Sequence, residues 1–206
     1  MNYLRIVGRA AVILSVALLA TTAFAQVIEY EADGQKFQTL SHHGLTVIVT
    51  HLPTQVAGYG LIQVSFANGS TIHWTVKPEG FQYVRGSETI TALSTDAVVN
   101  VMLDHASGND VAKLIVSYEK ALYAIPNMRS DNGYEQRRQG TLAGGSSARL
   151  RAAAAASAIM LAQVRIAPGG STDGAVFLKL PHDPKALAGG HIVFRCDDEV
   201  FEFNPD

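Results

Sequence analysis

The sequence predicts a mainly β protein with an α insertion, built as an antiparallel β-sandwich. Short segments in which apolar and polar residues alternate occur in both the early and the late part of the chain. Turn-forming dipeptides such as Asp33-Gly34 and Asn68-Gly69 separate them. Between the two groups, over about residues 94–164, the apolar period becomes helical. Seven or eight short antiparallel strands with regular turns are typical of a sandwich.

The first 25 residues predict an export signal rather than a part of the fold. Arg5 and Arg9 give a basic start, Ala10–Ala20 is uncharged and apolar, and Ala23-Phe24-Ala25 is typical of a cleavage site. The apolar stretch is shorter than the about 20 residues that a membrane-spanning helix needs. We therefore expect residues 1–25 to be a cleaved signal peptide, with an uncleaved anchor as the alternative. The mature protein is expected to be periplasmic or secreted, without a membrane span.

The remaining residues 26–206 are expected to form a single domain. Of the 16 basic residues, Arg5 and Arg9 leave with the signal, so 14 basic and 18 acidic residues remain and the formal charge is −4. No run of Lys or Arg stands out, which argues against a nucleic-acid or anionic-membrane partner. Cys196 is the only cysteine, so an internal disulfide is excluded.

The stretch Leu61–Val84 is expected to lie at the centre of the fold. Leu61–Ala67 and Ile72–Val76 each alternate with a period of two. Asn68-Gly69 between them tolerates the positive φ angles of a tight hairpin turn, and Phe81–Val84 gives a third strand. Three earlier strands are expected over Val27–Glu31, Lys36–Leu40 and Leu45–His51. A polar connection at Leu52–Gly60 then leads into the central stretch.

The helical block begins at Ser94, which can cap a helix that starts at the next residue. Gly108 suits the left-handed position after that helix. Asn109 or Asp110 then begins the clearest helix of the chain, which Pro126 ends. Its apolar residues fall in one stripe: Val111, Leu114, Ile115, Tyr118, Leu122 and Ile125.

A polar loop is expected over Asn127–Gly145. Ser146 or Ser147 then caps a third, alanine-rich helix that runs to about Ala162. One stripe of this helix consists of Leu150, Ala153, Ala154, Ser157, Leu161 and Val164. The small side chains at Ala153, Ala154 and Ser157 should allow close packing against another element.

Strand patterns resume after the turn Pro168-Gly169-Gly170-Ser171, with Ala175–Leu180 as one strand and His191–Cys196 and Glu199–Phe203 as a closing hairpin. The same turn, followed by Gly174-Ala175-Val176-Phe177 and the final hairpin, resembles the end of bacterial secreted immunoglobulin-like domains of unknown function. The resemblance implies an immunoglobulin-like sandwich and a non-catalytic module. It carries no site residue over, and the helical block departs from the plain pattern of those domains.

Several potential metal ligands recur in the chain: His42, His43, His51, Met102, His105 and Met128. A blue-copper site also needs a His and a weak Met shortly after its Cys, and neither follows Cys196. The CxxC, HExxH and acidic calcium-loop patterns are absent from the sequence. We therefore expect no metal and no cofactor, with His42 and His43 in a turn and His105 packed or snorkelling on an apolar helix face.

Nucleophile candidates have simpler structural explanations. Cys196 follows Arg195, which would favour a thiolate, but strand alternation places it on the apolar face of its strand, where burial makes it inert. Ser146 and Ser171 follow paired glycines outside any G-x-S-x-G elbow, so a helix cap and a turn explain them. Trp74, the only tryptophan, is expected in the core, with an exposed binding platform as the alternative.

The segment Arg129–Gln139 is the densest polar cluster of the chain. Tyr134, Glu135, Arg137 and Arg138 could recognise a carboxylate, a sugar or another protein, and a solvated linker is the alternative. Binding residues often lie on insertions that a rigid scaffold holds. We therefore expect the helical block, with Arg129–Gln139 as its exposed rim, to carry partner binding.

No pattern with catalytic spacing occurs, so we assign no catalytic, cofactor-binding or metal residue. The sequence favours an exported, non-enzymatic binding or interaction module, whose partner is another protein or a cell-envelope component. The alternative is a periplasmic hydrolase or metal-handling protein with a site that sequence spacing does not reveal.

Overall fold

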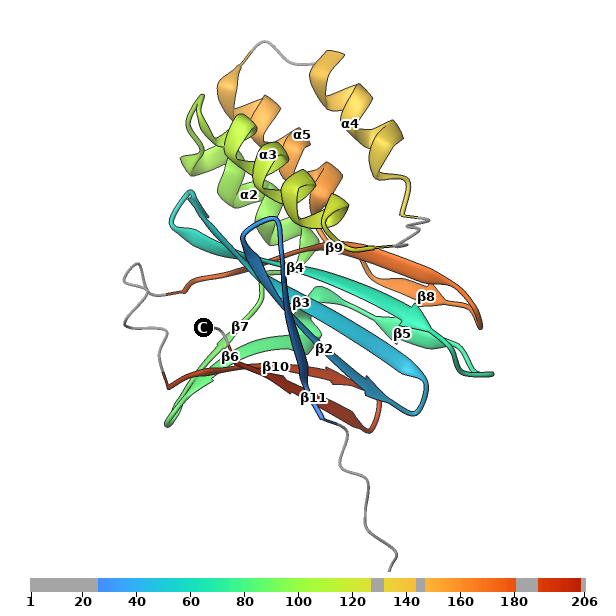
Figure 1. Cartoon of the computed structure of the whole chain (residues 1–206). Helices are drawn as coiled ribbons and strands as arrows, with labels where there is room; N and C mark the ends of the chain where they lie inside the picture. The colour runs from blue at the N-terminus through green and yellow to red at the C-terminus, as the bar shows by residue number, and fades with distance from the viewer. Residues whose placement is uncertain (1–25, 127–131, 144–146, 181–188, 205–206) are drawn as a thin grey trace, which may run out of the picture.

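A computed structural model describes residues 26–126, 132–143, 147–180 and 189–204 (Figure 1). Within these ranges the strands form three antiparallel sheets. The largest has the order β1-β2-β3-β4-β9, with β1 Ile28–Ala32, β2 Gln35–His42, β3 Leu45–Val56, β4 Tyr59–Asn68 and β9 Ser171–Leu178. The second has the order β11-β10-β6-β7, with β11 Glu199–Phe203, β10 His191–Cys196, β6 Phe81–Arg85 and β7 Glu88–Thr91. The third pairs β5 Trp74–Val76 with β8 Val164–Ile166.

Helices follow β7 and precede β8 in the sequence. They are α2 Thr95–His105, α3 Asp110–Tyr123, α4 Tyr134–Ala143 and α5 Ala148–Ile159, and a 3₁₀ turn, η1 Pro78–Gly80, precedes β6. None of the helices within the described ranges is both long and apolar enough to cross a bilayer.

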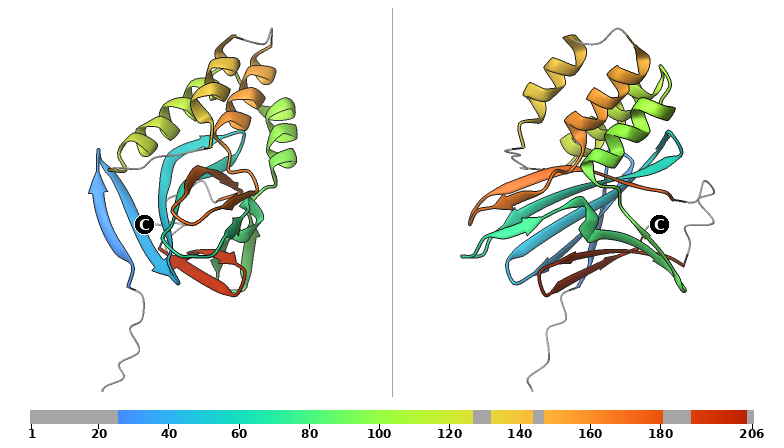
Figure 2. Two further views of the ribbon diagram at one scale, coloured as in Figure 1. Left: turned by 90° about the vertical axis from the view of Figure 1, so that its right-hand side faces the viewer. Right: turned by 180° about the vertical axis from the view of Figure 1, so that it is seen from behind.

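The five-stranded sheet is the middle layer of the molecule. The four-stranded sheet lies below it and the helices lie above it (Figures 1 and 2). Successive side chains of β9 point to opposite faces of this sheet. Val176 packs in the core between the two sheets, and Phe177 packs in the core under the helices. The mainly β class with an inserted helical block is therefore confirmed, and the arrangement is compatible with a β-sandwich.

Aromatic side chains fill the space between the sheets. The ring of Phe194 lies 4.4 Å from that of Phe81 and 5.3 Å from that of Phe66, measured between centroids. Trp74 is 4% exposed in the same core, which confirms its expected packing role, and its Nε1 donates to Ser70 Oγ at 3.1 Å. A buried aromatic residue contributes a large apolar area and so a large share of stability.

The central hairpin expected over Leu61–Val76 is wrong. β4 pairs with β3 and β9, whereas β5 pairs with β8. Neither Asn68 nor Gly69 adopts the positive φ that a tight hairpin turn requires. The chain instead leaves one sheet for another at this point, and Ile72 is 55% exposed rather than buried on a strand face.

The polar connection expected at Leu52–Gly60 is also wrong. β3 runs on to Val56 and β4 begins at Tyr59, so the true turn is Ala57-Gly58, at φ 50° and 84°. The register shifts between Leu52 and Gln55 around Pro53. Proline lacks the N–H that a regular ladder uses, and a bulge accommodates it within the strand.

The helix starts were predicted better than the helix ends. Ser94 Oγ accepts from Ala97 N, which confirms the cap of α2, and Ser147 Oγ likewise accepts from Leu150 N at the start of α5. Gly108 is not left-handed, because α2 already ends at an extended Ala106.

The stripe expected on α5 is wrong at Leu150, which is 49% exposed, and it is too narrow, since alanines on most sides of the helix are buried: Ala152, Ala153, Ala155, Ala156 and Ala158. Small side chains let α2, α3 and α4 all approach this helix. α5 also ends at Ile159 rather than at about Ala162, because the chain after it turns onto the edge of β9.

The loop expected over Asn127–Gly145 is corrected by α4, which occupies Tyr134–Ala143. Its flanks at 127–131 and 144–146 lie outside the described residues. The strand expected at Ala175–Leu180 begins earlier, at Ser171, while the closing hairpin β10–β11 is confirmed with the expected bounds.

Candidate functional site

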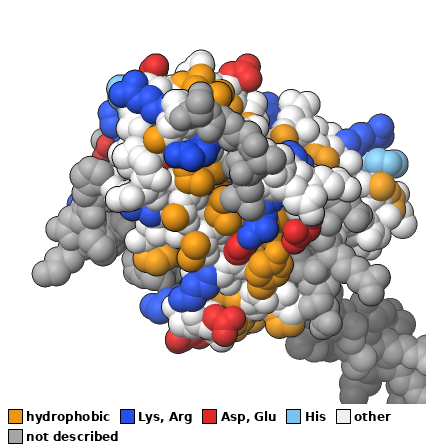
Figure 3. Space-filling model, turned by 90° about the horizontal axis from the view of Figure 1, so that it is seen from above, with side chains coloured by type: hydrophobic (Ala, Val, Ile, Leu, Met, Phe, Trp, Pro, Cys, Tyr) orange, Lys and Arg blue, Asp and Glu red, His pale blue; other side chains and the backbone are white. Residues whose placement is uncertain are grey.

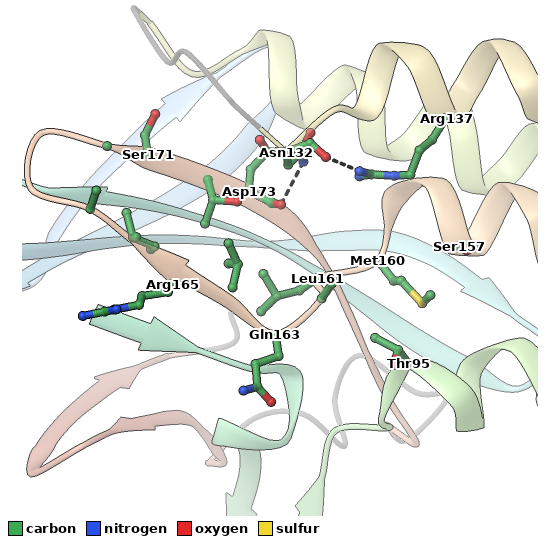
Figure 4. A pocket seen from close by; sticks show the side chains of 16 residues that line it. Thr95, Asn132, Arg137, Ser157, Met160, Leu161, Gln163, Arg165, Ser171 and Asp173 are labelled. Carbon is green, nitrogen blue, oxygen red and sulfur yellow. Dashed lines mark hydrogen bonds between the residues drawn. The ribbon is translucent and has the colours of Figure 1, made fainter. Parts of the chain in front are cut away.

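Strands β8 and β9 follow one another in the sequence but do not pair. β8 pairs with β5 and β9 pairs with β4, so the two strands diverge from the turn that joins them. A cleft of about 720 Å³ lies between them (Figure 4). Its walls come from β8, the outer edge of β9, the ends of α2 and α5, and two residues next to or within α4: Asn132 and Arg137.

Asn68 fixes the narrow end of this cleft. Its side-chain Nδ2 donates to the carbonyl oxygens of Ile166 at 3.1 Å and Ile72 at 2.7 Å. Its backbone N–H donates to Gly170 O, and its backbone oxygen accepts from Gly169 N. Asn68 therefore connects β4 to β8 and to the turn between β8 and β9. It does this instead of forming the hairpin turn that the sequence predicted.

The other end is fixed where the chain crosses β9. Leu161 N donates to Ala175 O at 2.9 Å, and Leu161 is 1% exposed. A Cβ on Gly174 would lie 2.5 Å from Leu161 Cα, which is too close for any side chain. The crossing therefore requires glycine at position 174.

Asn132 and Arg137 form the upper wall. Asn132 Nδ2 donates to Asp173 O at 2.9 Å, and Asn132 Oδ1 accepts from Tyr134 N at 2.8 Å at the start of α4. Arg137 donates from Nε and Nη2 to Ala158 O at 3.1 and 2.9 Å, and from Nη1 to Asn132 O (Figure 4). These bonds hold α4 against both α5 and the edge of β9.

Asp173 is the acidic residue of the lining, and it is withdrawn from solvent. Its side chain is 2% exposed, Tyr118 OH donates to Oδ2, and Oδ1 has no partner among the described residues. Burial raises the pKa of Asp173 to about 6, although hydrogen bonds from Tyr118 and Asn132 act in the opposite direction. Burial and the neighbouring carboxyl group raise the pKa of Tyr118 well above its usual value.

The exposed charges of the cleft are positive. Arg137 and Arg165 are both solvent-exposed, and Figure 4 places them at opposite ends of the lining. The wall between them is mostly apolar: Met160, Leu161, Val164 and Ile166. The arrangement can hold an apolar group and place a positive charge near one end of it.

The predicted metal candidates do not come together. His42 and His43 contact the carboxylate of Glu199 through Nδ1, at 3.3 and 2.6 Å. His51 is half-buried, with a pKa that burial lowers, and His105 is exposed at the end of α2 rather than packed. Met102 is buried under the helices, and Met128 lies outside the described residues. Across the part of the chain that is described, no group of His, Cys, Asp and Glu residues is arranged to hold a metal ion.

The nucleophile candidates occupy structural positions. Cys196 is 4% exposed, and its Sγ lies 3.2 Å from Thr75 O. Burial, together with the charges of Asp197 and Glu199, raises the pKa of Cys196 to about 11, so burial outweighs any effect of the adjacent Arg195. Ser171 begins β9 at the cleft, and Ser146 lies outside the described residues.

The expected rim Arg129–Gln139 is mostly part of α4. Residues 129–131 lie outside the described residues, and from Tyr134 onward the segment is helical. Tyr134 is 4% exposed, and its OH donates to Glu119 Oε1 at 2.9 Å, where Arg138 also binds at 2.5 Å. The linker alternative is therefore wrong for the helical part, because buried contacts attach it to α3.

Sequence reasoning missed Asp173, Asn132 and Arg165 as site residues. The run Ser171–Gly174 has the composition of a turn, so β9 was expected to begin after it. One signal was available, because Asp173 continues the alternation of Ala175 and Phe177 and is thus a carboxylate at a buried strand position.

No family model, curated protein or solved structure matches this chain.

Proposed function

We propose that this chain is an exported, non-enzymatic binding module and that the cleft between β8 and β9 holds its ligand. The observation that carries the proposal is the cleft itself, with a volume of about 720 Å³ and mostly apolar walls. Ligand sites commonly have volumes of about 300–1,000 Å³ and a few convergent polar groups on such walls.

The walls of the cleft are held in place by contacts within the chain. Asn68 holds the narrow end, the contact of Gly174 with Leu161 holds the crossing, and Asn132 joins the helices to β9. A site whose walls are already ordered loses less conformational entropy on binding. The helical block thus contributes to binding through Asn132 and Arg137, on its inner side.

The outer face of the helices is a less suitable site. Val116 and Tyr123 are 64% and 63% exposed there. Figure 3 shows that the hydrophobic side chains visible on this face are interrupted by charged ones. Docking surfaces are usually marked by contiguous apolar patches, which favours the cleft.

The finer parts of the proposal rest on the sequence. The basic, apolar and A-x-A order of residues 1–25 supports export to the periplasm or the medium. The turn and closing hairpin that resemble immunoglobulin-like domains support that family of sandwich. A cell-envelope component or another exported protein is the expected source of the ligand. A hydrolase or metal-handling activity stays a prediction that no described feature favours.

Native mass spectrometry of the protein purified gently from its own host tests the proposal. We expect the unsubstituted protein to carry a bound molecule, and its own mass to be that of a chain whose first residue is Gln26. Ala162→Trp, at an exposed position of the cleft, should lose the bound mass, whereas Ala112→Trp, at an exposed position on α3, should keep it. A parent without any adduct, or an adduct that survives Ala162→Trp, would contradict the proposal.

A further inference from the structure

We infer that the cleft takes a molecule with an apolar body and one anionic group, a carboxylate or sulfonate, placed at Arg165. The inference rests on the proposed function and adds the chemical class of the ligand to it. Two features of the lining carry it: the composition of the wall and the sign of its exposed charges.

The wall selects the apolar body. Met160 and Val164 are half-buried and Ala162 and Ala167 are exposed at the wall, while Leu161 and Ile166, at 1% and 3% exposed, belong to the packed core beneath it. Apolar surface removed from water contributes about 25 cal/mol per Å². A ligand that covers Met160, Val164 and the two alanines removes their remaining apolar surface from water and so gains affinity through a hydrocarbon part.

The charges select the anionic group. Among the described lining residues the charged side chains are Arg137, Arg165 and Asp173. Asp173 is 2% exposed and accepts a hydrogen bond from Tyr118, so its carboxylate does not balance the arginines at the surface. The cleft is thus locally positive in a chain whose formal net charge is −2. An anionic ligand complements this field, and a cationic one is repelled.

Arg165 is the residue that meets the anion. The guanidinium of Arg137 already donates to two backbone carbonyls, of Ala158 and Asn132, and its main task is to hold the wall. Arg165 lies in the middle of β8 and is exposed at the opposite end of the lining (Figure 4). Guanidinium binds carboxylate and sulfonate oxygens through paired N–H groups.

Two fluorescent probes that share the same ring system separate the contribution of the apolar body from that of the anionic group. Anilinonaphthalene sulfonate carries a sulfonate, and N-phenylnaphthylamine is the same ring system without it. We expect the sulfonate probe to bind the purified protein about threefold more tightly than the neutral probe, the size of an ion pair at an exposed site. Ala162→Trp should weaken both probes, and Ala112→Trp should weaken neither.

Arg165→Gln tests the anion directly. It should lower the affinity for the sulfonate probe about threefold and leave the affinity for the neutral probe unchanged, while Arg195→Gln, at an exposed position of β10, should leave both unchanged. Equal affinities of the two probes, or a sulfonate affinity that Arg165→Gln does not change, would overturn the anionic class but leave the cleft as a site. Binding that Ala162→Trp does not weaken would overturn both.

Discussion

Asp173→Asn tests the electrostatics of the cleft wall, because Asp173 is the buried carboxyl group among the described lining residues. The folded-state pKa of Asp173 is about 6, against an ordinary value of 3.8. Since each pKa unit corresponds to about 1.4 kcal/mol, the difference of about two units corresponds to about 3 kcal/mol.

The direction in which the free energy of unfolding changes with pH follows from the difference between the folded and unfolded pKa values. The folded state keeps the proton on Asp173 at pH values where the unfolded chain has lost it, so this contribution to stability is fully present below about pH 3.8 and is lost as the pH rises to about 6. Asparagine does not titrate. The free energy of unfolding of the parent minus that of Asp173→Asn should therefore fall by up to about 3 kcal/mol between pH 4 and pH 7.

Urea unfolding at several pH values measures this difference, since the remaining titrating groups are shared by parent and variant. Gln163→Asn, at an exposed position of the lining, removes no titrating group, so it is the control and should show a difference that is constant with pH. A constant difference for Asp173→Asn as well would show that this carboxyl group is not buried as described.

Three further changes test the packing. Trp74→Ala should cost about 3–5 kcal/mol in denaturant unfolding, as large-to-small changes in cores do, and a loss below about 1 kcal/mol would place the ring on the surface. Cys196 should react slowly with a soluble thiol reagent in the native state and quickly after unfolding, and rapid native labelling would contradict its burial. Gly174→Ala should lower stability by several kcal/mol because Leu161 leaves no room, whereas Gly140→Ala on α4, with open space around it, should not.

Local chemistry made part of this fold predictable. Asp33-Gly34 forms its hairpin with both residues at positive φ, and the Ser94 and Ser147 caps begin their helices as expected. Asn68-Gly69 carries an equally strong local turn signal but joins different sheets, because Asn68 uses its side chain to bind backbone groups far away in sequence. The residue types of a turn do not determine which strand pairs with the strand that follows the turn.

The candidate site was harder to predict because its parts are distant in sequence. Asn132, Arg165 and Asp173 come from three segments, and only the divergence of β8 from β9 makes a cleft between them. α4 was missed because it is polar, and Tyr134 is the only buried residue among its described side chains, so it shows little apolar periodicity. The polar cluster at residues 129–139 did point to the correct region, though its inner side rather than its rim forms the wall.

The most direct test of the binding site is a map of backbone amide chemical shifts in the purified protein during titration with anilinonaphthalene sulfonate. We expect the largest shifts on β8 and the first half of β9, including Arg165 and Thr172, and we expect Ala162→Trp to remove them. Shifts concentrated instead on the outer face of the helices around Val116 and Tyr123, or on the β10–β11 hairpin, would contradict the assignment of the binding site to the cleft.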